Sequence, residues 1–200
     1  SRIIGVIRQR VFAYYLGTSD AAGAFSAAFR IPNFLQNVFG EGALSASFIP
    51  VYAKLLAAHD EKEASRVANA VLTLLTMVTS VIVLVGVLTT PYFVNLFAYS
   101  FDPATKQLTV RLVQILFPGA GLLVLSAWCL GVLNSHRRFF LSYTAPVAWN
   151  LALITTLIVF GGREDQAQLA VTLAWGSVVG SVLQIAVQFP TVLKVLKSFG

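Results

Sequence analysis

Arginine and polar side chains are concentrated in the first quarter of this chain, where apolar residues surround them. Arg2, Arg8, Arg10 and Arg30 lie within its first thirty residues, and Glu41 follows. Guanidinium groups stay charged at physiological pH and bind phosphate oxygens through paired hydrogen bonds. This set therefore predicts recognition of an anionic, phosphate-bearing group, whereas a site for organic cations would need carboxylates and aromatic rings.

Each arginine also has a simpler explanation. A charged side chain near a membrane surface can extend its head to lipid phosphate or pair with a carboxylate. On an ideal helix Arg2 and Arg8 lie about 120° apart, so they share a cavity only if it is wide or the helix is bent. Arg30 and Glu41 would lie nearly in line, which leaves a structural ion pair as an alternative to cargo binding.

The composition indicates an integral membrane protein. Of the 200 residues, 57% are hydrophobic and 11% are charged, whereas soluble globular domains have roughly 25% charged residues. Charge-free windows occupy residues 67–101, 112–135, 139–162 and 166–193. Each is longer than the roughly 20 residues that a membrane-spanning helix needs. We therefore expect an all-α fold.

We expect six spans within a single lobe of residues 1–200, at residues 1–16, 20–58, 66–97, 108–133, 139–160 and 168–193. The second span is too long for one straight crossing at about 1.5 Å per residue. Proline and glycine are where helices bend, so Pro32, Gly40 and Gly42 are expected to form its hinge or gate. Helices 1 and 2 are expected to be bent.

Basic residues predict the orientation of these spans. Short cytoplasmic loops carry an excess of lysine and arginine. The richer set follows the second, fourth and sixth spans and is expected in the cytoplasm: Lys54, Lys62, Arg66, Arg137, Arg138, Lys194 and Lys197. The opposite set is Lys106, Arg111 and Arg163. His136 is expected to join the cytoplasmic charge cluster and to contact lipid phosphate.

Residues for catalysis or metal binding are scarce. His59 and His136 fall in predicted loops, and Cys129 is the single cysteine. Nucleophilic catalysis and zinc binding need several such groups at defined spacings. We expect no enzymatic activity, no cofactor and no metal. Because the basic residues are dispersed at membrane ends, nucleic acid is not an expected partner.

Three segments resemble the MurJ/MviN family of lipid II flippases, within the superfamily of multidrug and oligosaccharide (MOP-type) exporters. They are SRIIGVIRQR at residues 1–10, AFSAAFRIPNFLQNVFGEGALSASFIPVYAKLL at 24–56 and LNSHRRFFLSYTAPVAWNLALI at 133–154. The resemblance implies the six-helix N-terminal lobe of a MOP-type two-lobed helical bundle, with the C-terminal lobe absent from this chain.

The function that the resemblance implies is lipid II transport by alternating access. The cargo would be the undecaprenyl-diphosphate-linked peptidoglycan precursor, moved across the bacterial cytoplasmic (inner) membrane by a multi-pass protein that also contacts membrane lipids. The resemblance assigns Arg2 and Arg8 to the two arginines of the first helix that face the family's cationic cavity. It assigns Arg30 to a basic position before Ile-Pro-Asn, and Glu41 to the acidic residue of a GEGA-type block, so these four are the expected substrate-binding residues.

Two positions depart from the family pattern. Gly23 stands where many members have an acidic residue, and Gln36 stands where several have arginine. A flippase for another lipid-linked oligosaccharide and a non-transporting membrane scaffold therefore stay as alternatives. A scaffold would tolerate both departures and the loss of Arg8. Coupling to a cation or to the membrane potential is expected, and six helices do not choose between them.

Overall fold

The computed structural model describes residues 2–197, with the exception of the side chains of Ile31, Pro32, Glu41 and Lys197. Within this part the regular structure is helical, which confirms the all-α prediction. The helices are α1 (Arg2–Leu16), α2 (Asp20–Gln36), the π-helix η1 (Asn37–Phe48), α3 (Ile49–Ala57), α4 (Glu61–Phe97), α5 (Pro103–Ser135), α6 (Phe139–Phe160) and α7 (Gln166–Lys197).

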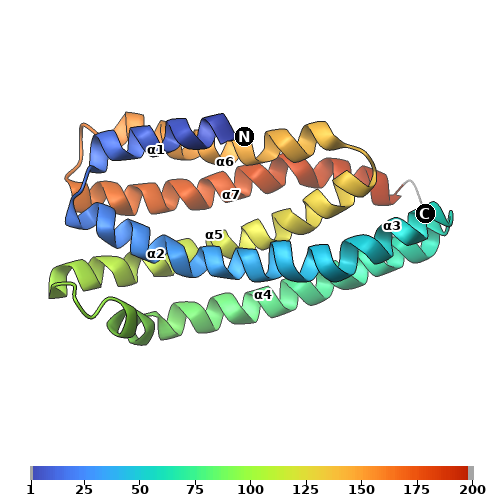
Figure 1. Ribbon diagram of the computed structural model, residues 1–200, viewed down its shortest axis with the longest axis horizontal. Helices are drawn as coiled ribbons and strands as arrows, with labels where there is room; N and C mark the ends of the chain where they lie inside the picture. Colours follow the sequence, from blue (N-terminus) through green and yellow to red (C-terminus); the bar gives the residue numbers. More distant parts are fainter. Residues whose placement is uncertain (1, 198–200) are drawn as a thin grey trace.

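The helices form an elongated bundle in which successive long helices run in opposite directions (Figure 1). α5 lies at its centre and packs against α2, α4 and α7, while α1 packs against α6. By length and composition, α4, α5, α6 and α7 can each cross a membrane. The most apolar window of α5 is 72% buried, whereas that of α4 is only 17% buried. α5 is therefore the core helix, and α4 forms an edge.

The outer face of α4 is apolar along its length. Leu74, Met77, Val81, Leu84 and Leu88 follow one another at three- or four-residue intervals, and each is at least 60% exposed. This spacing places them on one side of the helix. A continuous apolar surface of this kind belongs in contact with lipid chains rather than water.

Several polar side chains within the long helices bond to neighbouring helices or to their own backbone. Ser126 of α5 donates to Gln188 Oε1 of α7 over 2.6 Å and accepts from Gln184 Nε2 over 2.7 Å. Gln114 Nε2 donates to the carbonyl of Val87 on α4. Hydrogen bonds between membrane helices replace the water that the hydrocarbon region lacks, so these polar groups hold the bundle together.

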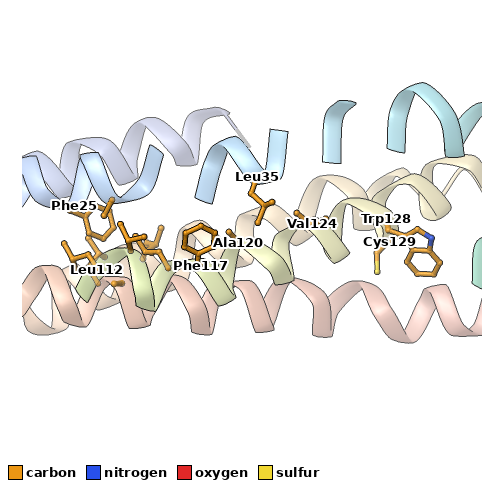
Figure 2. Close-up of a cluster of buried hydrophobic side chains, with 14 of the residues drawn as sticks. Phe25, Leu35, Leu112, Phe117, Ala120, Val124, Trp128 and Cys129 are labelled. Atoms are coloured by element: carbon orange, nitrogen blue, oxygen red, sulfur yellow. The ribbon is translucent and has the colours of Figure 1, made fainter. Parts of the chain in front are cut away.

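Apolar side chains of α5 fill the space between α2 and α7 (Figure 2). Leu112, Phe117, Val124 and Trp128 are all buried. Further along α5, the ring of Trp128 also stacks on that of Phe48 in η1, with ring centroids 6.4 Å apart. The core is thus continuous from α2 and η1 through α5 to α7.

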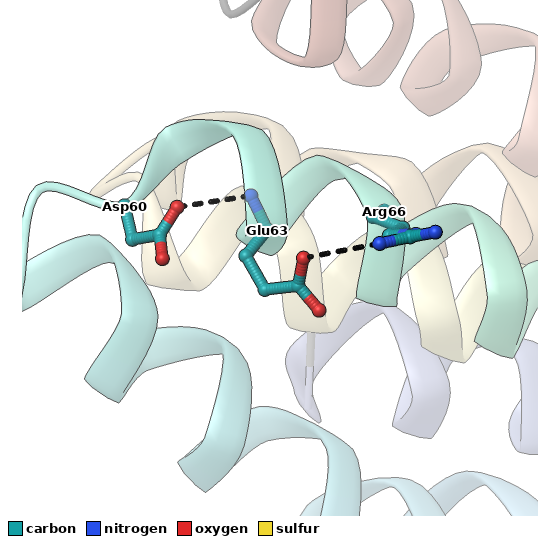
Figure 3. A network of polar contacts seen from close by, with 3 residues as sticks. All are labelled: Asp60, Glu63 and Arg66. Atoms are coloured by element: carbon teal, nitrogen blue, oxygen red, sulfur yellow. Dashed lines mark hydrogen bonds and ion pairs between the residues drawn. The ribbon is translucent and has the colours of Figure 1, made fainter.

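Local sequence signals define the short connections. Gly17 ends α1 with a φ of +55°, a conformation that glycine adopts without the steric cost of a side chain. Ser19 then caps α2 by accepting a hydrogen bond from the Ala22 amide. Asp60 likewise caps α4 through the Glu63 amide (Figure 3). The adjoining Glu63–Arg66 ion pair is largely exposed and contributes little to stability.

α6 and α7 approach closely because α7 carries glycine at the contact. A Cβ atom at Gly176 would overlap Thr156 of α6. Thr156 has little freedom to move away, since its hydroxyl donates to the Ala152 carbonyl over 2.8 Å and its β-branched side chain has few rotamers.

Tyr52 links the end of the long second helix to the connection between α5 and α6. Its side chain is fully buried, and its Oη lies 2.7 Å from Nε2 of His136. The ring of His136 is half-buried and packs edge-on against Tyr52, and its contact with lipid phosphate stays a prediction. Burial lowers the pKa of His136, and the positive charge of Arg138 lowers it further, while Glu61 acts in the opposite direction.

We predict that Gly176→Val lowers the thermal unfolding midpoint of the complete gene product that contains this chain. Overpacking of this kind costs about 1–3 kcal/mol. Gly23→Val is the matched control, because nothing lies within 4 Å of a Cβ atom at that helical position. Circular dichroism of the detergent-purified variants measures both midpoints. Equal midpoints would contradict the close α6–α7 contact.

We also predict a pH dependence of stability from His136. Because its pKa is lowered in the folded protein, folding favours the neutral ring. Its contribution is therefore complete above the ordinary histidine pKa of about 6.5 and is lost as the pH falls below that value. His136→Gln should flatten the decline in unfolding midpoint between about pH 7.5 and pH 5.5. His59→Asn, at an exposed turn, should leave the decline as in the wild type.

Candidate functional site

The long second helix carries most of the polar residues that the sequence singles out. α2, η1 and α3 follow one another without a break. π-Helical segments are rare and occur frequently at functional sites. Within η1, a Cβ atom at Gly40 would lie 3.1 Å from Cβ of Ala127 on α5, whereas the surroundings of Gly42 are looser. Gly40 therefore permits a close helix contact.

The hinge role predicted for Pro32, Gly40 and Gly42 stays a prediction. The change from α-helical to π-helical hydrogen bonding begins at Asn37, between Pro32 and Gly40 in the sequence. The side chain of Pro32 lies outside the described residues.

A cavity of about 260 Å³ lies where α1, α2, α6 and α7 converge. Three polar side chains and six apolar ones line it: Arg8, Gln9, Ser26, Phe12, Phe25, Phe29, Leu153, Leu157 and Leu173. Small-molecule pockets generally have volumes of roughly 300–1,000 Å³. This cavity can therefore receive one chemical group of a large ligand, but not the whole of it.

Aromatic rings connect the helices around this cavity. Phe12 of α1 lies 5.5 Å from Phe25 of α2, measured between ring centroids, and Phe25 lies 5.8 Å from Phe29. Phe29 in turn lies 5.9 Å from Trp149 of α6. Phe25 and Phe29 share a helix face because they are four positions apart. Rings at these separations attract one another beyond simple burial.

Arg8 completes this chain of contacts. Its guanidinium carbon lies 4.9 Å from the centroid of the Trp149 ring, within the range of a cation–π interaction. The side chain is half-buried and lines the cavity. Arg8 and Phe12 are four positions apart, so one face of α1 supplies both the charge and the first aromatic ring.

The other predicted site residues do not line this cavity. Arg2, Arg10 and Arg30 are exposed, and none of the three contributes to the cavity lining. The side chain of Glu41 lies outside the described residues, as does the alternative ion pair between Glu41 and Arg30. The structure therefore brings Arg8 into the cavity, and the roles of Arg2, Arg30 and Glu41 stay predictions.

The two departures from the family pattern differ in their surroundings. Gly23 is exposed, with open space where a side chain would extend, so packing does not require glycine there. Gln36 is half-buried near the start of η1.

Trp149 is a site residue that the sequence reasoning missed. It lies in a charge-free window that is hydrophobic on every side, so helical periodicity does not indicate which face meets the cavity. The signal available was the segment APVAWN, which places a proline, a tryptophan and an asparagine within one span.

The arrangement suits the anionic group of an amphiphile. One guanidinium lies beside apolar and aromatic walls, and Gln9 and Ser26 supply further hydrogen-bonding groups. Among the described residues, no group of three or more histidine, cysteine, aspartate or glutamate side chains could hold a metal ion. A larger groove of about 640 Å³ between α6 and α7 is lined by threonines and apolar side chains, and has no charged residue in its lining.

Comparison with protein families gives a match over nearly the whole chain. The family model described as lipid II flippase MurJ matches residues 12–198. The probable lipid II flippase MurJ of Rhizobium tropici is 39% identical over 195 residues, which cover 94% of this chain and 36% of the relative. The lipid II flippase MurJ of Burkholderia cenocepacia is 32% identical over 197 residues, covering 98% of this chain and 38% of the relative.

A solved structure has the same helical arrangement. The lipid II flippase MurJ in an inward closed conformation superimposes with a TM-score of 0.72 at 26% sequence identity. The match covers 99% of this chain and 44% of the solved one. The chain thus spans less than half the length of the relatives and the structure that it matches.

Proposed function

This chain belongs to the lipid II flippase MurJ family, and we propose that it forms the N-terminal lobe of a transporter for lipid II. The cargo would be moved across the bacterial cytoplasmic membrane by alternating access, for use in peptidoglycan synthesis. The family match over residues 12–198 supports the assignment. The proposed activity is transport, with no covalent step and no cofactor.

The observation that carries the proposal is the position of Arg8 beside a cavity within the bundle. Charged side chains at membrane depth are costly and usually face a protein interior or a water-filled path. An arginine there matches the diphosphate of lipid II, because its planar N–H groups bind phosphate oxygens in pairs. Arg2, Arg30 and Glu41 are proposed to contact other parts of the cargo.

The size of the cavity supports binding of only a part of lipid II. At about 260 Å³ it accommodates a phosphate and its immediate surroundings, not a disaccharide with a peptide. We propose that Pro32, Gly40 and Gly42 let the long second helix change shape as the larger portion passes. The π-helical hydrogen bonding of η1 is consistent with such a change.

The orientation and the driving force follow from charge. The loops rich in basic residues are proposed to face the cytoplasm. An anionic cargo that leaves an inside-negative cytoplasm gains about 2.3 kcal/mol per charge for each 100 mV of membrane potential. The membrane potential would therefore favour outward movement of an anionic cargo, and a coupling cation is the alternative.

We predict that Arg8→Ala in the complete gene product abolishes rescue of a bacterium depleted of its own lipid II flippase. Hydrogen bonds to charged groups contribute about 1.5–3 kcal/mol, so cargo binding should weaken about ten- to a hundred-fold. Arg8→Lys should rescue partially, since it keeps the charge without the planar donors. Growth is compared at equal membrane abundance.

Arg163→Ala is the matched control, because this arginine is exposed in the connection between α6 and α7. It should rescue as the wild type does. Rescue by Arg8→Ala would remove Arg8 from the proposed mechanism. Failure of a well-expressed wild type would instead favour another lipid-linked cargo or a scaffold without transport.

A further inference from the structure

The indole of Trp149 attracts the positive charge of Arg8 without neutralising it. Among the described side chains, the only ion pair joins Arg66 to Glu63, so Arg8 has no carboxylate partner there. The Arg8 guanidinium carbon instead lies 4.9 Å from the centroid of the Trp149 ring. An aromatic face attracts a cation through its quadrupole but has no carboxylate lone pairs. Within the described part of the chain the guanidinium donates to no other residue, which leaves its five N–H donors available for an anion.

Trp149 is itself held in place from two sides. Its ring packs against Phe29 of α2, with centroids 5.9 Å apart. On α7, a Cβ atom at Gly180 would lie 2.9 Å from Cδ1 of Trp149 and 3.1 Å from its carbonyl oxygen. The α7 backbone therefore lies against the indole at Gly180, and a larger residue at that position would displace the indole. This support fixes the surface on which Arg8 lies.

A carboxylate in place of the indole would give a different site. It would occupy the guanidinium donors in a paired ion bridge, so an incoming phosphate would have to compete for them. An aliphatic residue would leave the guanidinium without electrostatic support and free to turn away. Only an aromatic ring both holds the charge and leaves it unpaired.

We propose that Trp149 is a positioning residue for anion binding, which holds the Arg8 guanidinium beside the cavity with its N–H donors directed to the phosphate of the cargo. This inference rests on the proposed function of Arg8. Trp149 of α6 would thus support phosphate binding by positioning Arg8 of α1, without contacting the cargo itself.

The test measures binding of farnesyl diphosphate, and of uncharged farnesol, to the complete gene product in lipid nanodiscs. Loss of a partly desolvated cation–π contact should weaken farnesyl diphosphate binding about five- to thirty-fold in Trp149→Leu. Trp149→Phe keeps a ring and should remain within about threefold of the wild type. Farnesol binding should not change, because it does not use the charge of Arg8.

Trp175→Leu is the matched control for loss of an indole. Trp175 lies on α7, is 55% exposed and lines the outer groove between α6 and α7. Its replacement should leave farnesyl diphosphate affinity unchanged. A loss equal to that of Trp149→Leu would overturn the proposal, since it would show a general effect of removing tryptophan.

If Trp149→Leu does not fold, fluorinated tryptophans at position 149 provide a second test, because they keep the size and shape of the indole. Successive fluorine atoms weaken the negative face of the ring at nearly constant shape, so diphosphate affinity should fall stepwise. An affinity that is independent of fluorination, together with lost binding in Arg8→Ala, would overturn the role of Trp149 and leave the proposed function standing. Wild-type binding in Arg8→Ala, or no binding by the wild type, would overturn both.

Discussion

A polar group in the hydrocarbon region of a membrane must find its partner inside the protein, because no water is available there. The bundle satisfies this requirement largely between α5 and its neighbours. Ser126 joins Gln184 and Gln188 of α7, and Gln114 reaches the backbone of α4. These contacts place polar side chains where they bind helices together. The outer surface of α4, in contrast, is apolar, as contact with lipid requires.

The charge of Arg8, which is half-buried beside the cavity, is stabilised in a different way. The glutamines join helices to one another: Gln184 Nε2 donates to Ser126, Gln188 Oε1 accepts from Ser126, and Gln114 Nε2 donates to the Val87 carbonyl. The Arg8 guanidinium lies over the Trp149 ring, which attracts the positive charge but is not a strong hydrogen-bond acceptor. A residue whose burial cost is offset without using its donors is suited to binding an anion. Phe12 and Phe29 line the same cavity, and apolar surroundings strengthen an electrostatic contact made there.

The sequence predicted the helical fold well, because charge-free windows follow directly from the absence of water in a bilayer. Among the arginines that it singled out, Arg8 lines the cavity between α1, α2, α6 and α7. The sequence did not predict Trp149, since a helix that is hydrophobic on all sides gives no periodic signal for the face that meets a cavity. The contact of His136 with Tyr52 was equally hidden, because it joins segments that are distant in the sequence. The π-helical hydrogen bonding of η1 lies in a stretch where glycine suggested only a bend.

The cavity is lined by four helices, so its shape depends on their relative positions. Its charge comes from α1, its aromatic walls from α1 and α2, and its remaining lining from α6 and α7. The contact that positions Arg8 crosses from α1 to α6, so any displacement of α1 relative to α6 would also separate the guanidinium from the indole. Glycine contacts such as Gly180 against Trp149 bring α6 and α7 close together. With the proposed role of Arg8, anion binding and the position of α1 would be linked, because each would stabilise the arrangement that the other requires.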